Sequence, residues 1–92
     1  MSLIFSWDRA KAEANLKKHG VSFEEASTAF GDLLSLTVHD PVHSEGEARF
    51  VLLGRSFREK LVVVVHSEIE DGIRIISARE ATPRERRDYE QS

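Results

Sequence analysis

The segment RIISAREATPRERRDY, residues 74–89, carries five arginines and a tyrosine in a chain whose formal net charge is −3. Arg79 is expected at the end of a strand, just before a capped helix begins. The unpaired N–H groups of a helix start attract an anion, and a guanidinium binds phosphate through two hydrogen bonds. Arg79 is therefore the first candidate for a phosphate ligand. The alternative is an ion pair with Glu80 or Glu85.

Other side chains of this segment, Arg74, Arg86 and Tyr89, are candidate substrate contacts. Alternation along a strand places Arg74 and Arg79 on opposite faces unless a bulge intervenes, so we do not expect them to serve one site together. Arg86 lies among alternating charges that are typical of a solvated helix surface. Tyr89 is able to stack on a base, but a single tyrosine more often docks such a helix to the core.

The sequence EGEAR places Glu47 and Arg49 two positions apart, so an extended backbone points both side chains to the same face. A carboxylate beside a guanidinium combines a general base with a cation that stabilises the transition state of phosphoryl chemistry. The alternative is a charge pair between strands. These residues alone leave both interpretations open.

The segment NLKKHG ends the first predicted helix with the cluster Lys17, Lys18 and His19. These side chains suit the negative end of a helix dipole, and His19 is also able to exchange a proton near neutral pH. His39 and His43 lie in a polar loop without a complete set of metal ligands, and the chain has no P-loop or dinucleotide fingerprint. We therefore predict no metal and no other cofactor.

The length of 92 residues predicts one small domain, residues 1–92, with a modest core. Residues 1–48 hold four Lys/Arg against eight acidic residues, whereas residues 49–92 hold nine against eight. The acidic total argues against general affinity for nucleic acid, which depends on cations, but permits a local basic site. The sequence has no cysteine and shows no signal or transmembrane segment, so we expect a cytoplasmic protein that does not contact membranes.

Three helices are predicted from capping residues at Asp8, Ser22 and Thr82. Glutamates three positions after the second and third caps complete capping boxes, and Pro83 suits the first helical position. Gly20 suits the end of the first helix. The predicted helices cover residues 9–18, a segment from residue 23 toward Phe30, and a segment from Pro83.

Alternating apolar residues predict four strands after a short apolar segment at Leu3–Phe5. The first strand begins at Leu34, and the runs RFVLLG, KLVVVVHS and GIRIISAR follow with short connections. The run Val62–Val65 is apolar at both parities, which indicates a central strand with both faces covered. The expected fold is α+β, with two N-terminal helices, an antiparallel β-meander of about four strands and a C-terminal helix.

The segments WDRAKAEANLKKHGVSFEEA, EAR and IRIISAREATPRERRDYE, in this order and over nearly the whole chain, resemble the BrnT toxins of bacterial type II toxin–antitoxin systems. The resemblance implies a RelE-like fold and metal-independent RNA cleavage that inhibits translation and growth. It also implies a BrnA-like antitoxin, a ribbon-helix-helix protein through which the complex binds operator DNA, and a dimer or hetero-oligomer as the assembly.

By position in these motifs, the resemblance assigns catalysis to Lys18, His19, Glu47, Arg49 and Arg79. The implied chemistry is attack of a ribose 2′-hydroxyl on the adjacent phosphorus, with Glu47 or His19 as the base and the two arginines as stabilisers of the transition state. The implied substrate contacts are Lys17, Arg74, Arg86 and Tyr89.

Two other classes of function remain open. A non-catalytic module that binds the antitoxin and acts as a co-repressor in a DNA-bound complex agrees with the net acidity. A structural interaction domain, whose charges are only solvated pairs, predicts that Arg49→Ala or Arg79→Ala changes no activity and alters stability by at most about 1 kcal/mol.

Overall fold

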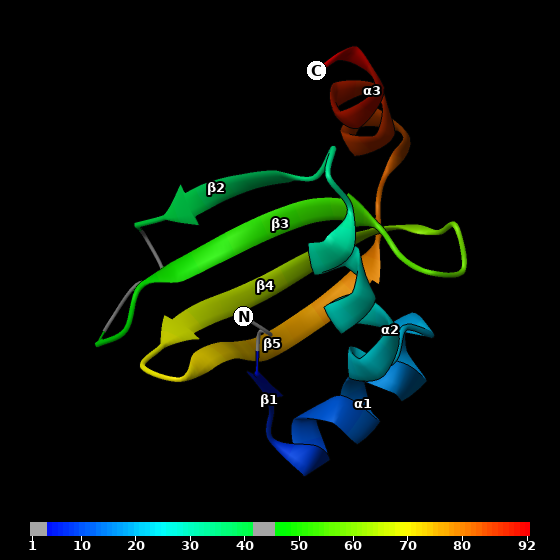
Figure 1. The fold of residues 1–92 in the computed structure, drawn as a ribbon. Helices are drawn as coiled ribbons and strands as arrows, with labels where there is room; N and C mark the ends of the chain where they lie inside the picture. The colour runs from blue at the N-terminus through cyan, green and yellow to red at the C-terminus, as the bar shows by residue number, and fades with distance from the viewer. Residues whose placement is uncertain (1–3, 42–45) are drawn as a thin grey trace.

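The computed structural model describes residues 4–41 and 46–92. Along the chain, one short strand comes before two adjacent helices, the other strands follow them, and a third helix ends the chain (Figure 1). The elements in chain order are β1 Phe5–Ser6, α1 Arg9–His19, α2 Phe23–Thr28, the 3-10 helix η1 Ala29–Gly31, β2 Leu36–Asp40, β3 Arg49–Arg55, β4 Leu61–Ile69, β5 Gly72–Glu80 and α3 Pro83–Gln91.

The strands form one mixed five-stranded sheet in the order β1-β5-β4-β3-β2. The meander from β2 to β5 is antiparallel, as predicted, and β4 is the central strand. The prediction of about four antiparallel strands was wrong in one respect, because β1 adds a fifth strand parallel to β5. Its two residues are too few to show a period in the sequence. Leu3, where the apolar segment starts, lies outside the described residues.

Gly72 lets the N-terminal segment approach β5. Its φ of 153° is rare for L-residues, and a Cβ there would lie 2.0 Å from the carbonyl oxygen of Ile4. That same carbonyl accepts a hydrogen bond from the Ile73 N–H at 2.9 Å. A side chain at position 72 would therefore block the entry of β1 into the sheet.

The core lies between one face of the sheet and the helices α1 and α2 (Figure 1). Phe23 and Ala26 of α2 pack with Val62 and Val64 of β4, and all four side chains are fully buried. This contact removes the apolar side of a short helix from water, which is what stabilises a helix of only six residues.

The three predicted N-caps are confirmed, since the side chains of Asp8, Ser22 and Thr82 each accept a backbone N–H three residues on. The capping box of α3 is complete. At α2 the box is only half formed, because the Glu25 carboxylate accepts a hydrogen bond from the Ser56 hydroxyl at 2.7 Å. This bond ties α2 to the hairpin between β3 and β4 instead.

Asn15 joins α1 to the sheet. Its amide donates to the carbonyl oxygens of Val21 at 3.0 Å and Ala78 at 2.8 Å, and its carbonyl accepts from the Ala78 N–H at 3.1 Å. The side chain is 7% exposed, so these bonds form away from water. They fix α1 against the free edge of β5, beyond the short stretch that pairs with β1.

Replacing Asn15 by alanine leaves these backbone groups without partners. We predict that Asn15→Ala lowers the free energy of unfolding by about 2–4 kcal/mol, measured by chemical denaturation. Lys17→Ala, at an exposed position of the same helix, is the control and should change it by less than about 0.5 kcal/mol. Equal effects of the two substitutions would show that Asn15 does not hold α1 in place.

Candidate functional site

The side of the sheet opposite α1 and α2 is called here the open face. Strand register aligns its side chains in three rows across β3, β4 and β5. The rows are Arg49–Ser67–Arg74, Val51–Val65–Ser77 and Leu53–Val63–Arg79. Because directly paired residues point to the same side of a sheet, Arg49, Arg74 and Arg79 share the open face.

A bulge in β5 is what brings Arg74 and Arg79 to the same side. Val65 pairs with Ser77 but His66 pairs with Ile75, so one residue of β5, Ile76, has no counterpart on β4. The extra residue reverses the alternation of the strand. The expectation that the two arginines lie on opposite faces was therefore wrong, because the intervening bulge was not visible in the sequence pattern.

The first row, Arg49–Ser67–Arg74, consists of polar residues only. Glu47 precedes β3 and its carboxylate lies 3.2 Å from the Arg74 guanidinium, with both side chains partly exposed. Arg49 is half-buried, and its register partners are Ser67 on β4 and Asp40 on β2. Glu47, Arg49 and Arg74 thus gather at one end of the open face, although the sequence had placed only the first two together.

Arg79, at the other end, makes a two-pronged ion pair with Glu85 of α3, with nitrogen–oxygen distances of 2.8 and 2.9 Å. Glu85 also accepts the Thr82 N–H at 2.8 Å. The Glu85 carboxylate therefore lies where the sequence analysis expected a phosphate, beside Arg79 and the start of α3. In the free protein Arg79 forms the ion pair with Glu85 that was the alternative to phosphate binding. The hydrogen bonds from Arg79 lower the pKa of Glu85 to about 2.

Between the two ends the floor of the open face is apolar. A shallow groove of about 220 Å³ runs here, with α3 at its side. Two carboxylates of α3, Glu85 and Asp88, border it, and its floor is formed by Leu36, Val38, Val51, Leu53 and Val63. The groove was not predicted from the sequence, although the alternating apolar residues of β2 and β3 are the pattern that indicates it.

The cluster Lys17, Lys18 and His19 is not brought into contact with these arginines. All three side chains are exposed at the end of α1, the helix that packs on the opposite side of the sheet. Within the described residues they form no hydrogen bond or ion pair with Glu47 or with the arginines of the open face. Asn15 anchors α1 at Ala78, so the cluster lies toward the end of β5 that carries Arg79.

Tyr89 docks α3 to the body of the domain. Its ring is 8% exposed, its hydroxyl donates to Asp32 at 2.6 Å, and the Arg55 guanidinium lies 5.5 Å from the ring centre. The ring is therefore unavailable for stacking on a base, and the docking interpretation is the one the structure supports. Arg86 is exposed on the same helix, in keeping with a solvated face.

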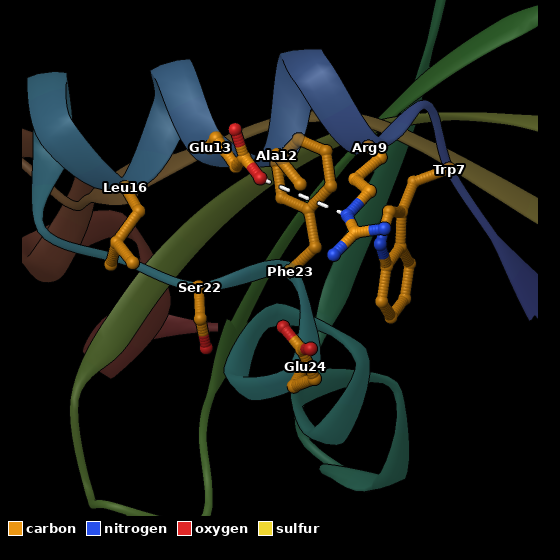
Figure 2. Close-up of a pocket in the computed structure, with 8 residues that line it drawn as sticks. All are labelled: Trp7, Arg9, Ala12, Glu13, Leu16, Ser22, Phe23 and Glu24. Carbon is orange, nitrogen blue, oxygen red and sulfur yellow. Dashed lines mark ion pairs between the residues drawn. The ribbon is translucent and has the colours of Figure 1, made fainter.

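A second cavity, of about 400 Å³, lies on the helix side between α1 and the start of α2 (Figure 2). Trp7 packs edge-on against Phe23 at its wall, with ring centres 5.9 Å apart. Arg9, the basic residue in its lining, is paired with Glu13 at 3.8 Å. This pocket has a mixed lining of apolar and charged side chains and lies across the sheet from the arginine rows.

No cluster of metal-binding side chains occurs among residues 4–41 and 46–92, and His43 lies outside those ranges. None of the described helices has the length and hydropathy needed to span a membrane.

The fold and the open face define the class: a small α+β domain that gathers arginines on the side of a mixed sheet opposite α1 and α2. The family model described as "Ribonuclease toxin, BrnT, of type II toxin-antitoxin system" matches residues 7–85. The chain belongs to this family, which confirms the resemblance found in the sequence.

The chain is also similar to the crystal structure of the Brucella abortus ribonuclease toxin BrnT. The two share 19% sequence identity and superpose with a TM-score of 0.63, over 88% of this chain and 99% of that one. At this identity the likeness supports the fold. A search of curated proteins finds no match.

The Arg79–Glu85 ion pair should make the free energy of unfolding depend on pH. The folded pKa of Glu85 is about 2 against an ordinary 4.5, so the carboxylate stabilises the fold above pH 4.5 and this contribution is lost as the pH falls toward 2. Glu85→Gln keeps an acceptor for the cap but removes the charge. We predict a loss of about 1–2 kcal/mol in the free energy of unfolding at pH 7, discounted for partial exposure.

Chemical denaturation of the wild type and of Glu85→Gln at several pH values measures this loss of stability. The difference between their free energies of unfolding should vanish as the pH falls toward 2. Glu80→Gln is the control, because its pair with Lys60 is exposed and 3.6 Å long. A loss for Glu85→Gln that stays constant from pH 7 to pH 2.5 would contradict the assignment.

Proposed function

We propose that the chain is an endoribonuclease toxin that binds RNA across its open face. The observation that carries this proposal is the placement of Arg49, Arg74 and Arg79 on one side of the sheet, away from the helices. Three guanidiniums with an apolar floor between them suit a strand of RNA, whose phosphates need cations and whose bases favour apolar contact. The family to which the chain belongs supports RNA as the substrate.

The proposed reaction is transesterification within the RNA strand. A base takes the proton of a ribose 2′-hydroxyl, the oxygen attacks the adjacent phosphorus, and the bond to the 5′-oxygen breaks as that oxygen is protonated. The products are a 2′,3′-cyclic phosphate and a free 5′-hydroxyl. Arg49, at the same end of the open face as Glu47, stabilises the charge that develops on the phosphoryl oxygens, so the chemistry needs no metal ion. Arg79, at the other end, holds a phosphate farther along the RNA strand.

Glu47 is the proposed base. Its carboxylate lies on the arginine-bearing side, 3.2 Å from Arg74, whereas His19 and Lys18 extend from the helix on the other side. Glu85 is unsuited to this role, because a carboxyl group with a pKa of about 2 is a weak base. His19 and Lys18 take part only where the RNA reaches around the free edge of β5.

The proposal includes a partner. Membership of a type II toxin–antitoxin family supports control by an antitoxin, and we propose a BrnA-like ribbon-helix-helix protein that carries the complex to operator DNA in the cytoplasm. The alternative is a non-catalytic co-repressor module. It is favoured by the ion pairs of Arg74 with Glu47 and of Arg79 with Glu85, which neutralise these two guanidiniums in the free protein.

Removal of a transition-state stabiliser separates these functions. We predict that the purified wild-type protein cleaves single-stranded RNA in the presence of EDTA, leaving cyclic phosphate ends. Arg49→Ala should reduce the rate by about 100-fold or more with the fold intact by circular dichroism. The control is Arg84→Ala, an exposed arginine of α3, which should cleave within about twofold of wild type. If the wild-type protein leaves RNA intact but binds its antitoxin, the co-repressor function holds instead.

Glu47→Gln tests the base. Loss of the carboxylate should lower kcat by about 100-fold or more. The same change frees Arg74 from its ion pair, so the KM for RNA should stay the same or fall. A raised KM with kcat unchanged would show that Glu47 serves binding and not proton transfer. Should His19→Ala abolish cleavage while Glu47→Gln does not, the base is His19.

A further inference from the structure

Ser67 has a buried hydroxyl group without a hydrogen-bond partner. The residue is 0% exposed at the centre of the sheet, on β4. Its Oγ is the buried side-chain oxygen that lacks a partner among residues 4–41 and 46–92. Buried polar groups in folded proteins nearly always have a partner, and each exception calls for an explanation, of which a functional role is one.

The neighbours of Ser67 are cationic on both sides. Register places Arg49 of β3 opposite it on one side and Arg74 of β5 opposite it on the other. Adjacent strands lie about 4.8 Å apart, so the two arginine backbones are separated by about 10 Å, with the serine midway. The side chains of both arginines therefore leave the sheet on either side of the hydroxyl.

We propose that Ser67 is a substrate-binding residue whose hydroxyl donates a hydrogen bond to a phosphate oxygen of RNA held between Arg49 and Arg74. The inference rests on the proposed function and adds to it a specific phosphate subsite. Two forked guanidiniums supply charge from the sides, and the hydroxyl supplies a short neutral donor from the floor. A tetrahedral phosphate fits three donors that converge in this way.

The Glu47–Arg74 ion pair controls access to this subsite. In the free protein the Arg74 guanidinium is turned to the Glu47 carboxylate at 3.2 Å, and half of the Arg74 side chain is exposed. An incoming phosphate competes with Glu47 for that guanidinium. Both side chains are flexible and partly solvated, so this exchange costs little. Because Ser67 is 0% exposed in the free protein, donation by its hydroxyl requires that the side chains around it move.

The experiment compares Ser67→Ala with wild type in two measurements on the full chain. The first is the affinity for a single-stranded RNA in which every 2′-hydroxyl is replaced by fluorine, so that it binds without being cleaved; the second is the thermal midpoint. We expect the Kd to rise about tenfold, as for the loss of one hydrogen bond to a charged group. The midpoint should stay the same or rise, because an unsatisfied buried hydroxyl is removed.

Ser56→Ala is the matched control. Ser56 is also buried, but its hydroxyl is bonded to Glu25 on the helix side. This variant should show the reverse result, a lower thermal midpoint and an unchanged Kd. The two serines thus separate a role in binding from a role in folding.

An unchanged Kd for Ser67→Ala, in a protein that binds the fluorinated RNA and cleaves ordinary RNA, would overturn the phosphate subsite and leave the proposed function standing. A lower thermal midpoint with an unchanged Kd would show that the hydroxyl serves the fold. Failure of the wild-type protein both to bind the fluorinated RNA and to cleave RNA would overturn the proposed function, and the subsite with it.

Discussion

The bulge between β4 and β5 is the constraint on which the functional surface depends. With one residue more on β5 than on β4, Ile73, Ile75 and Ala78 all point into the core although their spacing is not regular. The same shift turns Arg74 to the face that already carries Arg79. A regular strand would bury one of these guanidiniums or move the apolar side chains out of the core, at a cost of several kcal/mol. The bulge therefore lets β5 point its apolar side chains into the core and its arginines to the open face.

Carboxylates hold the guanidiniums of Arg74 and Arg79 at opposite ends of the open face. Glu47 keeps Arg74 near the first row, and Glu85 keeps Arg79 beside the start of α3. Each arginine is oriented by a carboxylate in the free protein, and an incoming phosphate must compete with that carboxylate for the guanidinium. The pairing also lowers the net positive potential of the surface. In the proposed function, this chain of formal charge −3 binds RNA phosphates at the arginines of the open face and has little general affinity for nucleic acid.

Local chemistry was predictable from the sequence, and long-range register was not. Asp8, Ser22 and Thr82 act as caps because each needs only the backbone of the next turn. The central position of β4 followed from its apolar run. The partner of Glu25, by contrast, is Ser56, and the place of Ser67 between two arginines depends on which residues pair across three strands. The parallel strand β1 was missed because two residues carry no periodic signal.

The central claim is that RNA binds on the open face, and a solution NMR titration tests it most directly. Protein labelled with ¹⁵N is titrated with the 2′-fluorinated RNA, and the signals of the arginine side chains and the strand amides are followed. If RNA binds on the open face, signals shift at Arg49, Arg74 and Arg79 and along β3 to β5, and the Trp7 indole signal does not move. Shifts confined to Trp7 and the end of α1, with the open-face arginines unmoved, would contradict it.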